Sequence, residues 1–535
     1  MKIKNILVFF VAFNLLSICT LWAQSQDSIP QQKTKVYLLH SDSLTFDKEI
    51  NPDVQVLKGN VVFRHDSSYM YCDSAYFYES TNSLDAFDHV KMEQGDTLFI
   101  SGDRLFYNGN TQLARLRKNV KMINRQATQT PDSLKDVTLT TDSLNYDRLN
   151  NVGYYFDKGK IVDEENTLTS TFGEYRVNTK LAIFNDSVKL DNPQFVLTSD
   201  TLHYSTDSKI ATILGPSIIE SDSGTIHTSR GWYNTTADVS SLLDRSQVIS
   251  GNRILIGDSI HYDKTNAFSE VFGNMVLIDT AQMITLEGQY GYYDEKTEFA
   301  FATDSARFLE YSRGDTLFLH ADTLQMTTVD STFREIKAYY GVRFYRVDAQ
   351  GVCDSMMFNT RDSILYMYTN PVLWNENYQI YGDTILVYMN DSTVDHAHII
   401  QFALAAQELE PTYYNQLKGN DMLAFFEDQA LRQIDVSGNA ESIFYPIDNG
   451  AMIGLNKTKS PYLSIWLKES KLERLKIWPT PEGTLTPIPD LNPDQKTLGD
   501  FYWFDYLRPL DKDDIYHVVK RKAGEAPRRS NKFVH

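Results

Sequence analysis

The feature that most constrains the fold is a short motif that recurs along most of the chain. It runs small residue, Asp, polar residue, apolar residue, any residue and aromatic residue, as in Ser199-Asp200-Thr201-Leu202-His203-Tyr204. Full and partial copies, thirteen in all, follow one another at intervals of 26 to 39 residues. Because one repeat of this length cannot bury an apolar face alone, the copies are expected to stack into a continuous core.

The spacing of apolar residues around the motif predicts where the chain bends. Around Asp200, the apolar positions are Leu197, three residues before it, and Leu202 and Tyr204, two and four after it. Strand side chains alternate between faces, so these positions share a face only if the alternation slips by one residue at the small-Asp pair. Such a slip marks a bulge or corner, where the Asp can accept hydrogen bonds from freed backbone N–H groups. The corner aspartates are Asp42, Asp73, Asp103, Asp142, Asp200, Asp258, Asp322, Asp354 and Asp383.

A second motif, such as Gly59-Asn60-Val61 or Gly273-Asn274-Met275, follows many copies by a dozen residues or more. It predicts strands that begin at a tight Gly or Asn turn. Each repeat is therefore expected to be a strand, a corner, a strand and a turn. The stacked repeats would form an all-β, elongated, antiparallel structure of two sheets joined along a folded edge. The side chains expected to point inward are Leu44, Phe46, Leu105, Tyr107, Leu144, Tyr146, Leu202, Tyr204, Ile260, Tyr262, Tyr293 and Phe358.

The N-terminus predicts export. Lys2 and Lys4 precede an apolar stretch over 6–16, and Ala23 before Gln24 forms a fair cleavage site, so residues 1–23 are interpreted as a signal peptide. A lipoprotein anchored at Cys19 is the disfavoured alternative, because the preceding Ile18 is bulky where lipidation signals have a small residue. The mature chain is then divided into a linker over 24–35, a repeat domain over 36–450, a β-rich extension over 451–510 and a basic, disordered tail over 511–535.

The net charge restricts the possible binding partners, and the spacing of the cysteines restricts the possible disulfides. The formal net charge is −19, and removing Lys2 and Lys4 makes it −21, which excludes nucleic acid as a partner. Cys72 and Cys353 are the cysteines left after cleavage, and both occupy the small position of the motif in distant repeats. The stacking of strands keeps such positions too far apart to bridge, so the sequence predicts two free thiols, buried at corners.

At these residues the chain resembles the OstA family of lipopolysaccharide-transport proteins, which includes LptA and the N-terminal domain of LptD. The shared pattern runs from about Val36 to Val387, with a final copy near Asp421. Residues 436–442 and 501–509 resemble larger OstA-like proteins of Bacteroidota. The chain has many more repeats than a short bridge protein, and it lacks the long C-terminal barrel of LptD.

This resemblance implies an open, V-shaped β-jelly roll whose apolar groove carries the acyl chains of lipopolysaccharide or lipooligosaccharide, with the inward-pointing side chains as its lining. It further implies a periplasmic, non-enzymatic protein of outer-membrane biogenesis, associated with the inner or outer membrane. Other lipopolysaccharide-transport proteins would stack on its edge strands.

No common catalytic, phosphate-binding or paired-cysteine motif occurs, so no catalytic residue, metal or cofactor is expected. His396 and His398 could hold a metal from one strand face, but no third ligand stands nearby. One Asp per repeat is too sparse for the six to eight oxygens of a calcium site.

Two alternatives stay open. The aromatic column could bind sugars, as in a β-solenoid carbohydrate-active enzyme or a surface polysaccharide-binding protein. Triplets such as Asp42-Ser43-Leu44 also match the O-glycan acceptor signature of exported Bacteroidota proteins, although the repeat itself generates that signature.

Overall fold

The computed structural model describes residues 34–49, 52–127, 133–312, 314–329, 333–390, 393–427, 430–469 and 471–525. The predicted signal peptide with Cys19, most of the linker and residues 526–535 lie outside them. Throughout the described part the chain is all-β, interrupted by four short 3-10 helices, and none of its helices is long and apolar enough to cross a membrane.

The chain divides into two compact units. The first comprises Met1–Arg125 with Asp142–Asn151, and the second comprises Gln126–Thr141 with Val152–His535. The first unit contains β1 (Tyr37–His40), β2 (Ser43–Phe46), β3 (Gln55–His65), β4 (Ser68–Tyr78), β5 (Ser83–Gln94) and β6 (Leu98–Asn108), and β7 (Leu113–Ala127) and β8 (Leu134–Asp147) contribute to both units.

The second unit holds all the remaining elements. The strands up to the middle of the chain are β9 (Val152–Tyr155), β10 (Gly159–Asp163), β11 (Asn166–Ser170), β12 (Phe172–Arg176), β13 (Leu181–Asn192), β14 (Phe195–Ser205), β15 (Ile210–Ile213), β16 (Ser217–Ser221), β17 (Gly224–Thr228), β18 (Arg230–Asn234), β19 (Val239–Ser250), β20 (Arg253–Asp263), β21 (Phe268–Asp279) and β22 (Ile284–Asp294). They are followed by β23 (Phe299–Glu310), β24 (Leu317–Thr328), β25 (Arg334–Tyr345), β26 (Gln350–Asn359), β27 (Ile364–Tyr368), β28 (Val372–Asn375), β29 (Tyr378–Tyr381), β30 (Thr384–Asn390), β31 (Thr393–Glu410), β32 (Tyr413–Glu427), β33 (Ala430–Phe444), β34 (Ile447–Asp448), β35 (Ala451–Met452), β36 (Gly454–Lys468), β37 (Lys471–Trp478), β38 (Glu482–Pro487), η1 (Ile488–Asp490), η2 (Pro493–Gln495), η3 (Asp505–Leu507) and η4 (Asp514–Tyr516).

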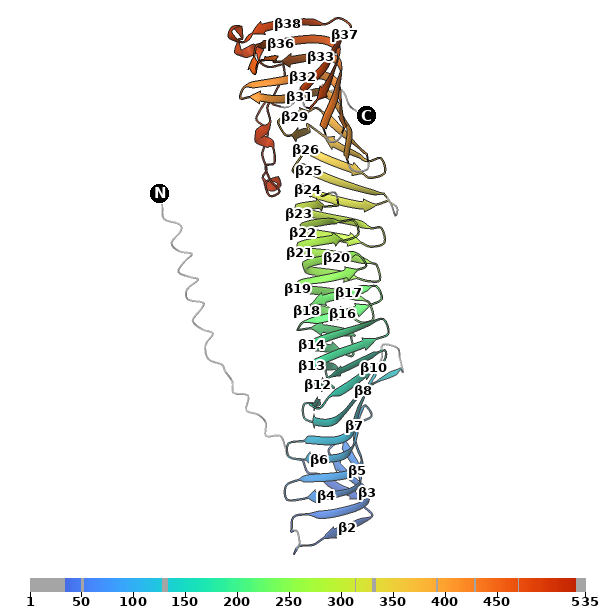
Figure 1. Cartoon of the computed structure of the whole chain (residues 1–535). Helices are drawn as coiled ribbons and strands as arrows, with labels where there is room; N and C mark the ends of the chain where they lie inside the picture. Colours follow the sequence, from blue (N-terminus) through green and yellow to red (C-terminus); the bar gives the residue numbers. More distant parts are fainter. Residues whose placement is uncertain are drawn as a thin grey trace, which may run out of the picture. The chain divides into compact units, whose positions relative to one another are not determined.

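Within the second unit the strands stack in chain order and pair antiparallel (Figure 1). Some partners of a long strand are split into two short strands, one for each half. β13, for example, pairs with β12 along its first half and with β11 along its second half. Between β29 and β30 the break falls at the predicted pair Gly382-Asp383, whereas between β11 and β12 it falls at Thr171, two residues before the predicted copy at Gly173-Glu174. A strand can be interrupted at the corner without losing its neighbours.

The predicted slip in side-chain alternation is confirmed by burial. In β6, Ile100 and Gly102 are buried before Asp103, and Leu105 and Tyr107 are buried after it. β14 repeats this pattern around Asp200. The two halves of each such strand therefore direct their apolar side chains into one interior.

The extra residue that shifts the register lies on the partner strand, so of the two predicted explanations of the slip, a bulge or a corner, the small-Asp pair is the corner. Phe87 pairs with Arg104 and Val90 pairs with Gly102, so two residues of β5 oppose Asp103 alone. These two, Asp88 and His89, have φ values of 60° and 48°. The same paired left-handed conformation occurs at 59–60, 118–119 and 273–274. The second motif is thus a bulge within a strand and not a turn before one.

Four of the nine corner aspartates pair with an Asn or His side chain of the bulge, where backbone N–H donors were expected. The Asn side-chain amide of the bulge donates across distances of 2.6 to 3.0 Å in three repeats, and His89 is 2.8 Å from Asp73 in another. A backbone donor occurs at Asp142, which accepts from the N–H of Asn119 over 3.2 Å. The Asn pairs are Asn60 with Asp42, Asn119 with Asp103, and Asn274 with Asp258. Each link joins two neighbouring strands at their corner. All nine aspartates are exposed or half-buried.

Cys72 and Cys353 are free and buried, as the sequence predicts. Burial raises the pKa of the Cys72 thiol to about 12, and it also raises the pKa of Cys353. Both thiols therefore stay protonated at neutral pH, where the thiolate would be the reactive form.

The C-terminal segment departs from its prediction. The β-rich extension ends with β38, and residues 498–519 then pack against the sheet. Phe504 and Leu507 join a buried cluster with Trp374 and Tyr381, and Ile515 is fully buried. Within 511–525, predicted as part of a disordered tail, the chain forms η4, and Val519 packs against the cluster of Phe504 and Leu507.

The bulge geometry predicts that two bulge glycines differ in how well they tolerate a side chain. A Cβ added at Gly273, with φ +78°, would lie 2.8 Å from a carboxylate oxygen of Asp258. Gly341 occupies a bulge with φ +68° and has nothing within 4 Å of an added Cβ. We expect Gly273→Ala to lower the free energy of unfolding by about 1 to 2 kcal/mol more than Gly341→Ala. Urea unfolding followed by circular dichroism measures this difference, and equal losses would show that the Asp258 contact is unimportant.

Candidate binding interior and its tyrosine clasps

The interior lies between two rows of half-strands. Arm A comprises the half-strands that lie on the same side of the corner as residues 98–102 of β6. Arm B comprises the half-strands on the other side, with residues 105–108 of β6. Their side chains meet across the interior. The rings of Phe63 in arm A and Phe77 in arm B, for example, have centroids 5.4 Å apart. The turns that join successive strands form the free margin of each arm.

The predicted lining residues lie in this interior with few exceptions. Nine of the twelve are at most 6% exposed. Phe358 is half-buried, whereas Leu44 and Phe46 are each 50% exposed because β2 pairs on only one side, with β3. The buried nine are Leu105, Tyr107, Leu144, Tyr146, Leu202, Tyr204, Ile260, Tyr262 and Tyr293. These side chains are covered in this structure, so a ligand could reach them only where the arms separate.

Tyrosine hydroxyls close the margin between the arms. Tyr107 in arm B lies 2.6 Å from Nδ1 of His65 in arm A. Arg148, from an arm B turn, donates to Tyr107 and His65 over 3.0 and 2.9 Å and to Asp66 over 2.6 Å. Since Arg148 donates to Nδ1, the network assigns the His65 proton to Nε2, which faces the Thr34 hydroxyl at 2.7 Å. We call such a link between an arm B tyrosine and an arm A polar side chain a tyrosine clasp.

Similar clasps recur along the chain. The tyrosine hydroxyl meets an amide, a carboxylate or a guanidinium of arm A, and in each case the partner stands 40 to 52 residues earlier. The pairs are Tyr146 with Gln94 (3.1 Å), Tyr175 with Gln126 (2.9 Å), Tyr204 with Asp163 (3.0 Å), and Tyr293 with Arg253. The sequence interpretation missed all the arm A partners. Their available signal was a polar residue at the end of an alternating apolar run, 40 to 52 residues before a tyrosine.

The clasp of Tyr204 contains a buried ion pair. Asp163 is fully buried, accepts from the Tyr204 hydroxyl, and lies 2.6 Å from Nζ of Lys209. Burial and the neighbouring Asp163 raise the pKa of Tyr204. Burial alone would lower the pKa of Lys209, but the carboxylates of Asp163 and Glu164 raise it. The two arms are thus held together here by a charged network, and separating them would leave the Asp163 carboxylate or the Lys209 ammonium without its partner.

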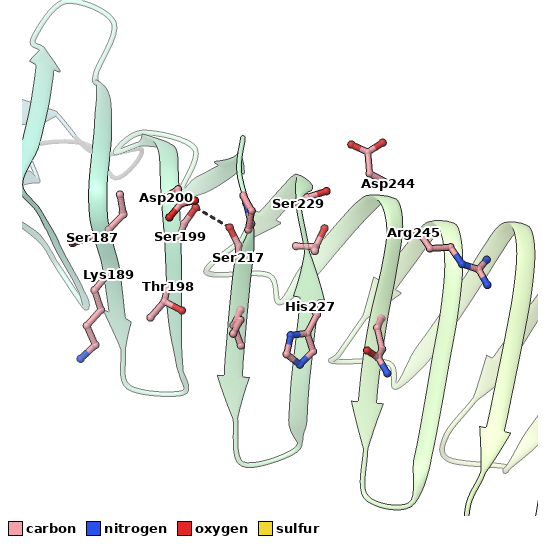
Figure 2. Close-up of a pocket in the computed structure, with 15 residues that line it drawn as sticks. Ser187, Lys189, Thr198, Ser199, Asp200, Ser217, His227, Ser229, Asp244 and Arg245 are labelled. Carbon is pink, nitrogen blue, oxygen red and sulfur yellow. Dashed lines mark hydrogen bonds between the residues drawn. The ribbon is translucent and has the colours of Figure 1, made fainter.

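A polar cleft lies on the outer side of the corners between β13 and β19. Its volume is about 710 Å³, and its wall carries Lys189, Asp200, His227 and Arg245 among several serines (Figure 2). Opposite charges alternate in it, and the Ser217 hydroxyl donates a hydrogen bond to that of Ser199 over 2.7 Å.

The described residues contain no group of three or more potential metal ligands. His396 and His398 are instead paired with Asp395 and Asp421.

Comparison with known proteins finds a family match over part of the chain. Residues 33–200 match the sequence model of a family described as OstA-like protein. No curated protein matches the chain. Among solved structures, it is similar to LptH from Pseudomonas aeruginosa, described as the LptA-homologous periplasmic component of the conserved lipopolysaccharide transport device, at 11% identity. That similarity covers 33% of this chain and 79% of LptH with a TM-score of 0.10, too low to carry a structural argument. The family match over 33–200 is therefore the finding that bears on function.

The clasps predict unequal effects of removing single hydroxyls. Tyr204→Phe removes one hydrogen bond each from Asp163 and Asn166 in a buried network, so we expect the free energy of unfolding to fall by about 1 to 2 kcal/mol. Tyr262→Phe removes a hydroxyl that has no hydrogen-bond partner among the described residues, and we expect a change within about 0.5 kcal/mol. Urea titration of the two variants separates these outcomes, and similar losses would argue against a stabilising clasp at Tyr204.

The His65 clasp predicts a loss of stability in acid. Burial and the Arg148 charge lower the pKa of His65 from its ordinary value of 6.5. Below pH 6.5 the unfolded state then binds more protons than the folded state, so the stabilisation is complete above that pH and is lost as the pH falls toward the folded pKa. Between about pH 7.5 and about pH 5.5, we expect the urea midpoint to fall less in His65→Gln than in the parent protein. His517→Gln, at an exposed position, should follow the parent, and parallel profiles for all three would contradict the assignment.

Proposed function

We propose that this protein is a non-catalytic, OstA-like carrier that holds acyl chains of lipopolysaccharide or lipooligosaccharide between arms A and B, in a V-shaped β-jelly roll. The observation that carries the proposal is the family match over 33–200, which coincides with the first clasped repeats. We place the protein in the periplasm, at the inner or outer membrane, and assign it to the larger OstA-like proteins of Bacteroidota.

The chemistry of the interior suits an acyl chain. The facing side chains are apolar, and burial of a methylene is worth about 0.8 kcal/mol, so a twelve-carbon chain gains on the order of 9 kcal/mol. A neutral clasp is worth about 1 kcal/mol. The gain from one chain therefore exceeds the loss of a few neutral clasps, provided that the chain replaces the apolar contacts between the arms. The acidic surface is no obstacle, because the grip is apolar and an anionic head group can stay in solvent.

The edge strands support the proposed partners. β1 and β2 begin the first unit, where Leu39, Leu44 and Phe46 are each 50% exposed. β38 pairs only with β36, and its Leu485 is 60% exposed. Unpaired edges with exposed apolar side chains invite another strand. We propose that other lipopolysaccharide-transport proteins stack on these edges.

An aromatic cluster favours the second candidate, a surface polysaccharide-binding protein. On the outer face of arm B, Tyr292 packs against Phe268, Phe299 and Phe301 with centroid distances of 5.5 to 5.7 Å. Phe272, 47% exposed, packs against Tyr290. Half-exposed rings in a row can stack on sugars, although cross-strand aromatic pairs also stabilise a sheet without any ligand.

Site-specific photo-crosslinking in cells tests the proposed carrier. We expect a crosslinker at Ile260, which points inward, to capture lipopolysaccharide, and one at Ser259, the adjacent half-buried position, to capture little. Depletion of the protein should leave newly made lipopolysaccharide at the inner membrane. Normal lipopolysaccharide export with altered binding of surface polysaccharide would favour the second candidate, and equal capture at both positions would contradict the interior site.

A further inference from the structure

The row of tyrosine clasps has a gap in the middle of the second unit. The Tyr233 hydroxyl turns to Asp238, a residue of its own arm, over 2.7 Å. Its ring packs across the margin against Phe195, at 4.8 Å between centroids. The Tyr262 hydroxyl has no hydrogen-bond partner among the residues that the structure describes. Clasped tyrosines lie on both sides of this pair, at Tyr204 and Tyr293.

Side-chain length explains the gap. Ser221 stands 41 residues before Tyr262, the same separation that links Asp163 to Tyr204. The serine hydroxyl instead meets Ser223 and the carbonyl of Gly224, both in its own turn. A serine at the arm A margin is too short to reach the opposite tyrosine, whereas Gln94 and Gln126 do so in other repeats.

The margin between the arms is indented at the same place. A narrow notch of about 20 Å³, space for about one water, runs between Ile226 and Val248 of arm A and Tyr262 of arm B. These three side chains are each 6% exposed, whereas Leu168, Leu202 and Tyr204 in the preceding clasped repeats are fully buried. Lys264 also lines the notch and forms no ion pair with the described residues.

We propose that this gap, between the arm A turns of β16 to β19 and Tyr233 and Tyr262 of arm B, is the port through which a single acyl chain of an anionic lipid is admitted to the interior. The proposal rests on the proposed function and adds to it the place of admission. The chain slides past Ile226 and Val248, and Lys264 faces the anionic head group at the rim.

The energetics single out this position. Moving Tyr262 outward breaks no hydrogen bond across the margin. Moving the margin outward at Tyr204 and the neighbouring Lys209 breaks the hydrogen bonds of Tyr204 with Asp163 and Asn166 and separates the buried ion pair of Asp163 and Lys209. Stranding buried polar groups costs about 1 to 3 kcal/mol each, so opening at Tyr262 is favoured by roughly tenfold or more. A water-sized notch does not accommodate a hydrocarbon chain without such opening, which makes the absence of a clasp the decisive feature.

Installing the missing clasp tests the port. The probe is a palmitic acid analogue with a diazirine near its chain terminus, added to the full mature protein, and labelled positions are mapped by mass spectrometry. We expect labelling to concentrate around Ile226, Val248 and Tyr262. Ser221→Gln, which supplies the amide found in other clasps, should reduce that labelling about fivefold. Ser208→Gln, the same change in an exposed arm B turn, should leave it unchanged.

The outcomes separate the port from the proposed function. Labelling spread evenly over the clasped repeats, for example around Leu168 and Leu286 as well, would overturn the port and leave the interior site standing. Interior labelling that Ser221→Gln does not reduce would also overturn it, provided that a raised urea midpoint shows that the clasp has formed. Absence of interior labelling in the folded protein would overturn both.

Discussion

The structure depends on keeping one interior in contact with both halves of a bent strand. A strand that merely bent would send its apolar side chains outward beyond the corner, because alternation continues through a bend. Two local features on neighbouring strands keep the apolar side chains inward. The alternation of side chains slips at Gly102-Asp103 of β6, and β5 carries an extra residue opposite it, in the left-handed pair Asp88 and His89. The Asn or His of the bulge then ties the corner Asp. Every later feature, including the facing arms and their margin, follows from this local arrangement.

The sequence was sufficient for features that recur with the repeat. The slip at the motif, the inward position of Tyr107 and Tyr204, and the free, buried Cys72 all follow from alternation and small-residue spacing. The bulge at the Gly-Asn pair was interpreted as a turn, because this pair suits both, and only the cross-strand register separates the two. Leu44 and Phe46 fit the motif perfectly in sequence, yet they are exposed, since the pattern cannot show that a strand lacks a neighbour.

The clasps escaped the sequence interpretation for a different physical reason. A clasp joins residues about 40 to 50 positions apart whose types vary, so no short pattern contains both partners. His65, Gln94 and Asp163 each look like an ordinary polar residue at the end of a strand. Their role is visible only after stacking brings an arm B tyrosine opposite them. The folded C-terminal segment was missed in the same way, because Leu507 and Ile515 find their apolar partners only on the assembled sheet.

Polar closure of an apolar interior has a mechanical consequence. If the margin were apolar, separating the arms would expose apolar surface to water along its whole length. A neutral hydrogen bond at the margin can instead be replaced by bonds to water, at a net cost of about 1 kcal/mol. The margin can therefore open locally while the corners hold. Near β25 to β31, the C-terminal segment also covers the outer face of arm A, where Arg343 donates to the carbonyl of Leu507 over 3.0 Å and Tyr381 donates to that of Asp500 over 2.9 Å. Arm A is held there from both faces, so any separation of the margin in that region must come from movement of arm B.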